Sequence, residues 1–317
     1  MFLRRDYARS PLNSGMKRAL IATLFNEADN VAEWWECLLK QTVLPDEIGI
    51  VDGGSRDGTW EKLQELARQS PVPLRLEQRP SNIAGGRNAA IRLTSAEIVA
   101  VTDAGSFPEP AWFHEITLPL LENPAMDVTG GLNICEPDGD FARYLSQFEG
   151  QEVTGVTDGE IHPSSRNTAF RRQAWQDVGG YPEWLTLAAE DSLFTYGLNK
   201  VGKKFAFNPR ARVHWSARPS AEAYLKLLYR NGYGAAEAGL YAPYFLKRGL
   251  ITVFPLLLLL SRHRFRHLGF RYRKNSSGAL GWLAGVFKGH RPPPGWKRMD
   301  GIWLSPEAQK YLSGIRK

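Results

Sequence analysis

The most constraining feature of this sequence is a regular alternation of strand and helix patterns between residues 17 and 103. Short apolar runs rich in strand-forming residues alternate with segments whose apolar residues recur at helical spacing. The predicted strands are Arg18–Phe25, Glu47–Val51, Leu74–Gln78 and Ile98–Thr102, and the predicted helices are Ala28–Gln41, Thr59–Ser70 and Ile83–Ala96. This β-α order predicts an α/β fold in which helices flank a mainly parallel sheet.

Three of the predicted strands end in polar clusters, namely Asn26-Glu27, Asp52–Ser55 and Asp103–Gly105. Ligands of such sheets bind at the carboxyl ends of the strands, so we expect these clusters to converge. The turn after the first strand, Thr23–Glu27, contains no glycine, and the chain has no G-x-x-x-x-G-K-[ST] motif. These absences exclude the Rossmann dinucleotide fingerprint and the P-loop. The remaining candidate is a carboxylate-lined crevice that binds a base, a ribose and a divalent cation.

Several motifs, in a fixed order, resemble those of the family 2 inverting glycosyltransferases, which have the GT-A fold. Asp52–Thr59 is similar to the family's "DDGSTDGT" turn, and the resemblance covers about residues 17–235. The other matching segments are Asn26-Glu27, Gly85–Ala90, Asp103, Asn167–Arg172, Val178–Tyr181, Ala189–Asp191 and Val213-His214. The resemblance implies a GT-A, Rossmann-like sheet and the transfer of a sugar from a nucleotide-diphosphate donor.

The resemblance also implies which residues bind the donor nucleotide. Asp52 would accept a hydrogen bond from the base; without a ligand role, it would simply form an Asx turn with the residues that follow. Arg87 would meet the nucleoside or diphosphate; otherwise it is an ordinary charge on a helix surface. Thr23, Phe25, Glu27 and Asp103 complete the predicted donor site.

A divalent cation, Mn²⁺ or Mg²⁺, is the cofactor that the resemblance implies. The family's D-x-D motif supplies a second carboxylate, but here Gly105 stands in its place. Either Asp103 holds the metal together with diphosphate oxygens and His214, or metal dependence is weakened. His214 is alternatively a structural histidine at a strand end.

The pair Glu190-Asp191 matches the family's "ED" motif, which makes Asp191 the predicted general base and Glu190 a residue that orients the acceptor. Without that role, Asp191 would cap the N-terminus of a helix, where carboxylates are favoured. The family's arginine after this pair is absent from Ser192–Tyr196. Trp184 and Trp215 are predicted to flank the acceptor, where their rings would stack on a sugar.

Charge is unevenly distributed along the chain. Residues 221–317 hold 17 lysine and arginine residues and four acidic residues, a net charge of +13, whereas the whole chain carries +7. Leu250–Leu260 is the longest apolar run, too short to span a bilayer as a helix, and Pro255 lies within it. An apolar helix beside a basic, aromatic segment predicts attachment to an anionic membrane surface; a buried helix with a solvated basic edge, or RNA binding, would be the alternatives.

The sequence thus divides into a flexible extension at residues 1–16, a catalytic domain at 17–240 and a membrane-associating helical region at 241–317. The predicted function is non-processive, inverting transfer of one sugar, with UDP favoured, to a lipid-linked or membrane-adjacent glycan. The expected location is the cytoplasmic face of the cell membrane, and no nucleic acid partner is expected. A nucleotidyltransferase on a related sheet and a catalytically silent sugar-nucleotide or membrane-binding module are the alternatives.

Overall fold

The computed structural model describes residues 15–136, 139–149, 156–157, 160–216, 220–260 and 267–315. Its first half confirms the predicted alternation of strands and helices. The helices are shorter than their apolar patterns predict; the first, for example, begins at Val31 rather than Ala28 and ends at Leu39 rather than Gln41. In chain order the elements are β1 (Arg18–Leu24), α1 (Val31–Leu39), β2 (Glu47–Asp52), α2 (Thr59–Arg68), β3 (Leu74–Gln78), α3 (Ile83–Arg92), β4 (Ile98–Val101), β5 (Ser106–Pro108) and α4 (Trp112–Glu122).

The second half adds strands to the same sheet and then becomes mostly helical. Its elements are β6 (Val128–Glu136), α5 (Gly139–Glu149), β7 (Val156–Thr157), β8 (Glu160–Ile161), β9 (Thr168–Arg171), α6 (Arg172–Asp177), α7 (Glu190–Lys200), β10 (Phe205–Ser216), α8 (Ala221–Ala238), α9 (Ala242–Val253), the 3₁₀ helix η1 (Pro255–Leu260), α10 (Leu268–Lys288), β11 (Lys297–Met299), β12 (Ile302–Leu304) and α11 (Pro306–Ile315).

One eight-stranded sheet organises the catalytic part of the molecule, with the strand order β3-β2-β1-β4-β9-β6-β10-β5. The four strands β3, β2, β1 and β4 are parallel, as predicted. Strand β9 lies antiparallel between β4 and β6, and β5 lies antiparallel to β10 at the edge. The sheet is therefore mainly parallel, and its irregular half brings β10 beside the turn that follows β4.

Both faces of the sheet are buried, which explains the continuous apolar runs of the central strands. Alternate residues of β1 belong to different cores: Leu20 lies in the core formed with α1, α2 and α4, whereas Ile21 lies in the core formed with α3, α6 and α7. Trp34 and Trp112 are the largest fully buried side chains of the first core. Packing against these two cores holds the strands in place, and so positions the carboxyl ends of the strands, where the polar clusters meet.

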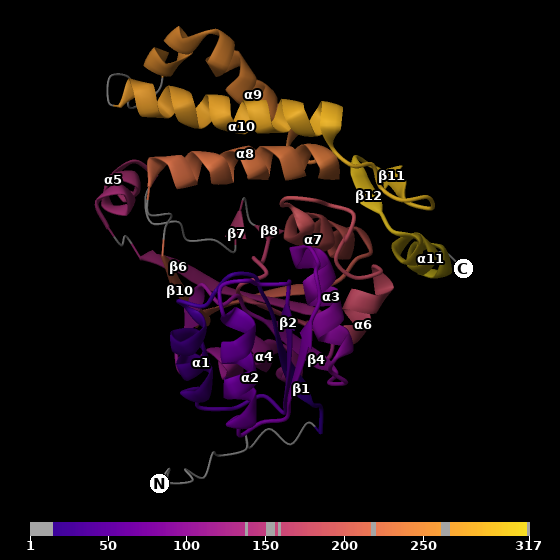
Figure 1. The fold of residues 1–317 in the computed structure, drawn as a ribbon. Coiled ribbons are helices and arrows are strands. Elements are labelled where there is room, and N and C mark those ends of the chain that lie inside the picture. The colour runs from indigo at the N-terminus through magenta and orange to yellow at the C-terminus, as the bar shows by residue number, and fades with distance from the viewer. Residues whose placement is uncertain are drawn as a thin grey trace.

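Helices α8, α9 and α10 form an outer layer on the side of the molecule away from α1 and α2 (Figure 1). Helices α8 and α10 lie side by side and run in the same direction, because Tyr229 contacts Gly281 and Tyr233 contacts Gly285. A Cβ atom at either glycine would collide with the backbone of α8. The two helices are thus in backbone-to-backbone contact. On its other side, α8 touches the loop before α7, where Gly234 meets Ala188.

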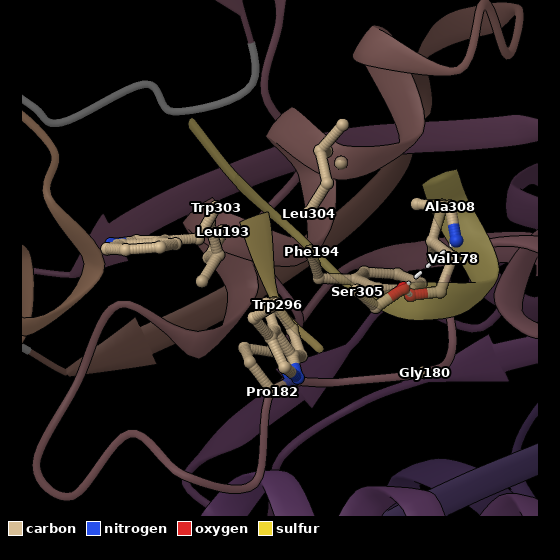
Figure 2. A pocket seen from close by; sticks show the side chains of 11 residues that line it. Val178, Gly180, Pro182, Leu193, Phe194, Trp296, Trp303, Leu304, Ser305 and Ala308 are labelled. Atoms are coloured by element: carbon tan, nitrogen blue, oxygen red, sulfur yellow. Dashed lines mark hydrogen bonds between the residues drawn. The ribbon is translucent and has the colours of Figure 1, made fainter. Parts of the chain in front are cut away.

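The last twenty described residues return to the catalytic unit. Leu304 and Ala308 join the core formed with α6 and α7, and the Ser305 hydroxyl donates a 2.7 Å hydrogen bond to the carbonyl of Val178. Figure 2 shows these side chains around a small cavity between the C-terminal segment and α7. At about 10 Å³ the cavity has room for no more than about one water molecule, so the segment is closely fitted.

The apolar run Leu250–Leu260 is not one helix, which corrects the sequence-based interpretation. Helix α9 ends at Val253, Phe254 adopts a non-helical conformation, and η1 begins at Pro255. The cause is Pro255, which lacks an N–H and disfavours helical geometry in the preceding residue. Within the described part of the chain, no helix combines the length and hydropathy needed to cross a membrane.

Candidate active site

Arg87 on α3 lies at the centre of the site and contacts two carboxylates from distant parts of the chain. Its Nη1 donates a 2.6 Å hydrogen bond to Glu190 at the start of α7, and its Nη2 donates a 3.0 Å hydrogen bond to Asp103 after β4. Only 2% of the Arg87 side chain is exposed, against 30% for Asp103. The guanidinium therefore joins the carboxyl end of the sheet to the helix that carries the predicted base.

The cluster is electrostatically coupled. Burial lowers the pKa of Arg87, but the charges of Asp103 and Glu190 outweigh burial and raise that pKa above its usual value. The pKa of Glu190 is raised by burial and by the charge of Asp191, although Arg87 opposes the shift. With one guanidinium against the carboxylates of Asp103, Glu190 and Asp191, the cluster has an excess of negative charge. A cation or the positive end of a dipole is therefore favoured beside it.

Asp191 is in the first turn of α7, where its Oδ1 accepts a 2.7 Å hydrogen bond from the Ser192 N–H. This contact joins adjacent residues and is not an N-cap, because α7 has no side-chain capping hydrogen bond; it leaves Oδ2 for another partner. Ala189, just before the helix, has a positive φ of 73°, a conformation that turns the chain sharply into α7. The turn places Glu190 inside, with 9% of its side chain exposed.

Tyr241, from the C-terminal region, reaches this same end of α7. Burial raises the pKa of its phenol, and hydrogen bonds with Tyr196 and Ser192 and the charge of Asp191 also act on it. Its backbone has a φ of 57°, which is unusual for a bulky residue. Sequence reasoning missed Tyr241 because only the fold brings it beside α7; no motif indicates it.

On the donor side, the first two polar clusters meet as predicted. The Asn26 N–H donates to the Ser55 hydroxyl at 2.8 Å, and the Arg56 N–H donates to the Asn26 side chain at 3.1 Å. Asp52 is fully buried and accepts hydrogen bonds from the Ser55 N–H and hydroxyl and from Gln78. The carboxylate thus holds the turn at Ser55, three residues on rather than the two of an Asx turn, and a base would reach it only if one of these contacts opened.

The remaining predicted donor residues line the same sheet edge. Thr23, next to the last residue of β1, lies opposite Gly86, where a Cβ atom would collide with the Thr23 hydroxyl; glycine there allows α3 to approach the strand. Phe25 is 61% exposed, so its ring is accessible to a ligand. The Glu27 N–H donates to Thr59, and the Glu27 carboxylate accepts from Asn30. Glu27 therefore holds the turn before α1.

Asp103 has the chemistry of a ligand for a hard divalent cation. Arg87 binds one of its carboxylate oxygens, and the side chain is partly exposed at the sheet edge. Within the described ranges, no group of three or more His, Cys, Asp and Glu side chains has the arrangement of a metal site. A metal here would accordingly take most of its ligands from the substrate, and the residues present fit that arrangement.

His214 is on β10, paired with Phe107 of β5. Its Nδ1 is 2.7 Å from Glu136 and its Nε2 is 3.0 Å from Glu109. Burial lowers the pKa of His214, but the hydrogen bonds and charges of Glu109 and Glu136 outweigh burial and raise it. Both ring nitrogens are thus held by carboxylates, and metal ligation would require one of these contacts to open.

The two predicted acceptor tryptophans have other aromatic or cationic neighbours. Trp184 is half-buried, and its ring meets that of Trp296 edge to face at 5.7 Å. Trp215 is also half-buried and lies 4.4 Å beneath the guanidinium of Arg166. The structure places them on different elements, Trp184 in the loop before α7 and Trp215 on β10, and its contacts do not bring them together.

Asn88, next to Arg87, is a positioning residue that sequence reasoning did not single out. Its amide donates to the Tyr181 carbonyl and to Glu183, each at 2.8 Å, and its oxygen accepts from Trp175 and from the Tyr181 N–H, each at 2.9 Å. One of the four bonds joins α3 to Trp175 of α6, and the other three join α3 to the segment that follows α6. The signal was present in the Gly85–Ala90 motif, but the partners become visible only in the fold.

Comparison with known proteins identifies the family. The family model "Glycosyl transferase family 2" matches residues 19–181, and "Glycosyl transferase family group 2" matches residues 151–284. The chain is 23% identical over 212 residues to the O-antigen chain rhamnosyltransferase RfbN of Salmonella typhimurium, covering 63% of this chain and 67% of that protein. It is 26% identical over 252 residues to the succinoglycan biosynthesis protein ExoA of Rhizobium meliloti, covering 75% and 74%.

Solved structures show the same fold. The mannosyltransferase PcManGT from Pyrobaculum calidifontis, in complex with GDP-Man and Mn²⁺, matches 95% of this chain and 80% of its own with a TM-score of 0.55 and 19% identity. TarS from S. aureus, in complex with UDP, matches 91% and 96% with a TM-score of 0.51 and 18% identity. The sheet is therefore that of the GT-A fold. The chain belongs to glycosyl transferase family 2 and is a glycosyltransferase.

Proposed function

We propose that this glycosyltransferase transfers a single sugar, with inversion, from a nucleotide-diphosphate donor to an acceptor hydroxyl, with Asp191 as the general base. The observation that carries the proposal is the Asp103–Arg87–Glu190 bridge, which fixes the start of α7 against the carboxyl end of the sheet. One buried guanidinium therefore connects the part of the site proposed to bind the donor with the part proposed to bind the acceptor. UDP is the favoured nucleotide, supported by the UDP complex of TarS, although PcManGT was solved with GDP-Man.

In the proposed reaction, Asp191 removes the proton of the acceptor hydroxyl as that oxygen attacks the anomeric carbon. The bond between that carbon and the diphosphate oxygen breaks on the opposite face, and the nucleoside diphosphate leaves with its electron pair. Glu190 is less suited to this role because it is buried and paired with Arg87, whereas Asp191 is half-buried and has one oxygen outside its contact with Ser192. General-base assistance of this kind contributes about 10²–10⁴-fold.

A divalent cation, Mn²⁺ or Mg²⁺, would be held by Asp103 and by diphosphate oxygens of the donor. When bound, such an ion stabilises the charge that develops on the leaving diphosphate. The complex of PcManGT with GDP-Man and Mn²⁺ supports this part of the proposal. His214 remains a predicted ligand whose two carboxylate contacts compete with a metal.

The acceptor is proposed to be a glycan carried by a lipid or displayed beside an anionic membrane, at its cytoplasmic face. The outer layer exposes apolar side chains that a water-soluble surface does not need, among them Leu250, Val253, Phe254, Leu256 and Phe287. Lys247 and Lys288 are on the same helices, so α9 and α10 carry basic as well as apolar side chains. This combination favours adsorption to anionic lipid.

The test of the catalytic proposal compares Asp191→Asn with Glu61→Gln, which removes an exposed carboxylate on α2. Asp191→Asn should keep the stabilisation by nucleoside diphosphate in a thermal-shift panel of UDP, GDP and dTDP. Its transfer rate should fall by about 10²-fold or more, while Glu61→Gln should transfer like the wild type. Normal turnover by Asp191→Asn would refute the assignment of the base.

A catalytically silent binding module is the second candidate, favoured by Gly105 in place of the second D-x-D carboxylate. Donor hydrolysis separates the two, because an active site of this kind slowly transfers sugar to water even without its acceptor. A wild-type protein that binds a nucleotide sugar but releases no sugar or nucleoside diphosphate would support the silent module.

A further inference from the structure

A cavity of about 420 Å³ lies in the outer layer, between α5, α9 and α10. Binding pockets for small molecules are typically about 300–1,000 Å³. Aromatic, aliphatic and basic side chains line it: Tyr144, Tyr244, Lys247, Arg248, Ile251, His267, Phe270, Arg271, Lys274 and Asn275. Its volume and lining are those of a ligand site, and the proposed sugar transfer leaves it without a role.

The cavity is strongly basic. Lys247 and Arg248 approach from α9, and Arg271 and Lys274 approach from α10, while none of its described lining residues is acidic. His267 and Phe270 belong to the start of α10, so the N-terminal end of a 21-residue helix also faces this region. Helix N-termini attract anions through their unpaired N–H groups and their dipole.

Two of the cations are held in place by the surrounding chain. Arg248 is 8% exposed, lies 4.5 Å above the ring of Tyr244 and donates a 3.3 Å hydrogen bond to the Lys274 carbonyl. Arg271 donates to the carbonyl of Leu258 at 3.3 Å and accepts from Asn275 at 2.7 Å through its own carbonyl. Burial lowers the pKa of Lys274 to about 8, so its charge is kept at a cost that an anion would offset.

One wall of the cavity is apolar and continues onto the exposed apolar surface. Tyr144, Ile251 and Phe270 form the wall, and the rings of Tyr144 and Phe270 meet edge to face at 5.6 Å. Leu250 and Val253 flank Ile251 on α9 and are 55% and 69% exposed. A ligand with both an anionic group and an apolar chain would match the basic lining of the cavity and the apolar surface beside it.

We propose that this cavity binds the phosphate group of a lipid, with the lipid's apolar chain lying along α9 and η1. The inference rests on the proposed membrane-adjacent acceptor and deepens it, because it gives that acceptor a phosphate next to its chain. The same chemistry occurs in a phosphate-linked carrier lipid and in an anionic bilayer lipid.

The experiment measures binding by the full-length protein without any sugar donor. Decyl phosphate is titrated below its micelle concentration and followed by intrinsic tryptophan fluorescence, alongside decyl maltoside and inorganic phosphate. Lys274→Met and Lys247→Gln should each weaken decyl phosphate binding by about tenfold. Arg273→Gln is the matched control, because Arg273 is exposed on α10 beside Lys274 but does not line the cavity. Its affinity should change less than about twofold.

The outcomes are distinct. Equal losses in Lys274→Met and Arg273→Gln would mean diffuse surface attraction and would overturn the proposal. Binding of decyl maltoside as tight as that of decyl phosphate would do the same, as would inorganic phosphate binding as tightly as decyl phosphate. Lys247 is exposed, so its variant remains informative if Lys274→Met alters the fold.

Vesicles then identify the lipid. Neutral phosphatidylcholine vesicles are doped with either a polyprenyl phosphate or phosphatidylglycerol at equal charge. Preference for the polyprenyl phosphate would support a carrier lipid, and equal binding would support a bilayer lipid; loss of either by Lys274→Met but not Arg273→Gln supports the cavity. These experiments measure lipid binding and not sugar transfer. The proposal for the cavity can therefore be confirmed even if Asp191 is not the general base, and it can be refuted even if Asp191 is.

Discussion

Arg87 Nη1 donates a 2.6 Å hydrogen bond to Glu190 Oε1, and the two residues are 103 positions apart in the sequence. The bond is almost completely buried and is completed by Asp103 on the other side of the guanidinium. A buried cation between two carboxylates costs little only while all three groups are present. Arg87 therefore holds the site together through its contacts with two other residues of the site, Asp103 and Glu190.

Removing the guanidinium should damage both stability and activity. Arg87→Met leaves two carboxylates without their shared partner, which should lower the free energy of unfolding by about 3–5 kcal/mol. Arg87→Lys keeps the charge but cannot reach both carboxylates in the same fork geometry, so its transfer rate should fall even where the fold survives. Chemical denaturation and initial-rate assays measure the two effects.

Arg92→Lys provides the control on the same helix, since Arg92 is largely exposed and lies outside the cluster. It should behave like the wild type in both assays. An Arg87→Lys enzyme with normal stability and normal transfer would show that the bridge does not position the site.

The second prediction concerns the cation. Asp103→Asn should weaken donor affinity in the presence of Mn²⁺ by about tenfold, an effect of about 1.4 kcal/mol, and should abolish the added stabilisation that Mn²⁺ gives with the donor. Thermal shift with nucleotide alone, metal alone and both together measures this coupling. Wild-type transfer that is indifferent to a chelator would contradict the metal's role.

Tyr241 should act as a positioning residue. Tyr241→Phe retains the ring and removes the hydroxyl that interacts with Tyr196 and Ser192 next to Asp191. Loss of a neutral hydrogen bond costs about 1 kcal/mol, so kcat should fall about fivefold while nucleotide binding stays unchanged. Tyr229→Phe on α8 is the control, and an equal loss there would remove the special role of Tyr241.

How much of this arrangement could be predicted depends on the range of the interactions. The strand and helix patterns of residues 18–102 are local, and the structure confirmed them, as it confirmed the contact of the Asn26 and Asp52 clusters. The role of Arg87 was different: its motif pointed to the donor, whereas its carboxylate partners come from the turn after β4 and from α7 and are set by tertiary contacts. Leu250–Leu260 was expected to form one apolar helix, bent by Pro255, whereas in the structure α9 ends at Val253 and a 3₁₀ helix begins at Pro255.

Lys274 gives a prediction with a defined dependence on pH. Its pKa of about 8 lies below its usual value of 10.5, so the folded state holds the proton less tightly than the unfolded state. The resulting destabilisation is complete below about pH 8 and disappears as pH rises towards 10.5. Lys274→Met should therefore melt at a higher temperature than the wild type at pH 7, with a smaller difference at pH 10.

The prediction concerns the difference in melting temperature between the variant and the wild type. The contributions of the other titratable and charged groups near the cavity are nearly the same in both proteins and largely cancel; these groups are Lys247, Arg248, His267, Arg271, Tyr144 and Tyr244. The expected result is a variant that is more stable and binds phosphate lipids less well. A constant difference in melting temperature from pH 7 to pH 10 would contradict the buried charge.

The backbone contact between α8 and α10 limits how this protein can evolve. A methyl group at Gly281 or Gly285 would separate the two helices, and no neighbouring side chain can move aside because the obstacle is the main chain of α8. In a deep mutational scan, these glycines should tolerate replacement as poorly as catalytic residues do. Low tolerance at these two positions would then reflect contact between two main chains far from the reacting groups. A reader of the scan alone would take this structural requirement for a catalytic one.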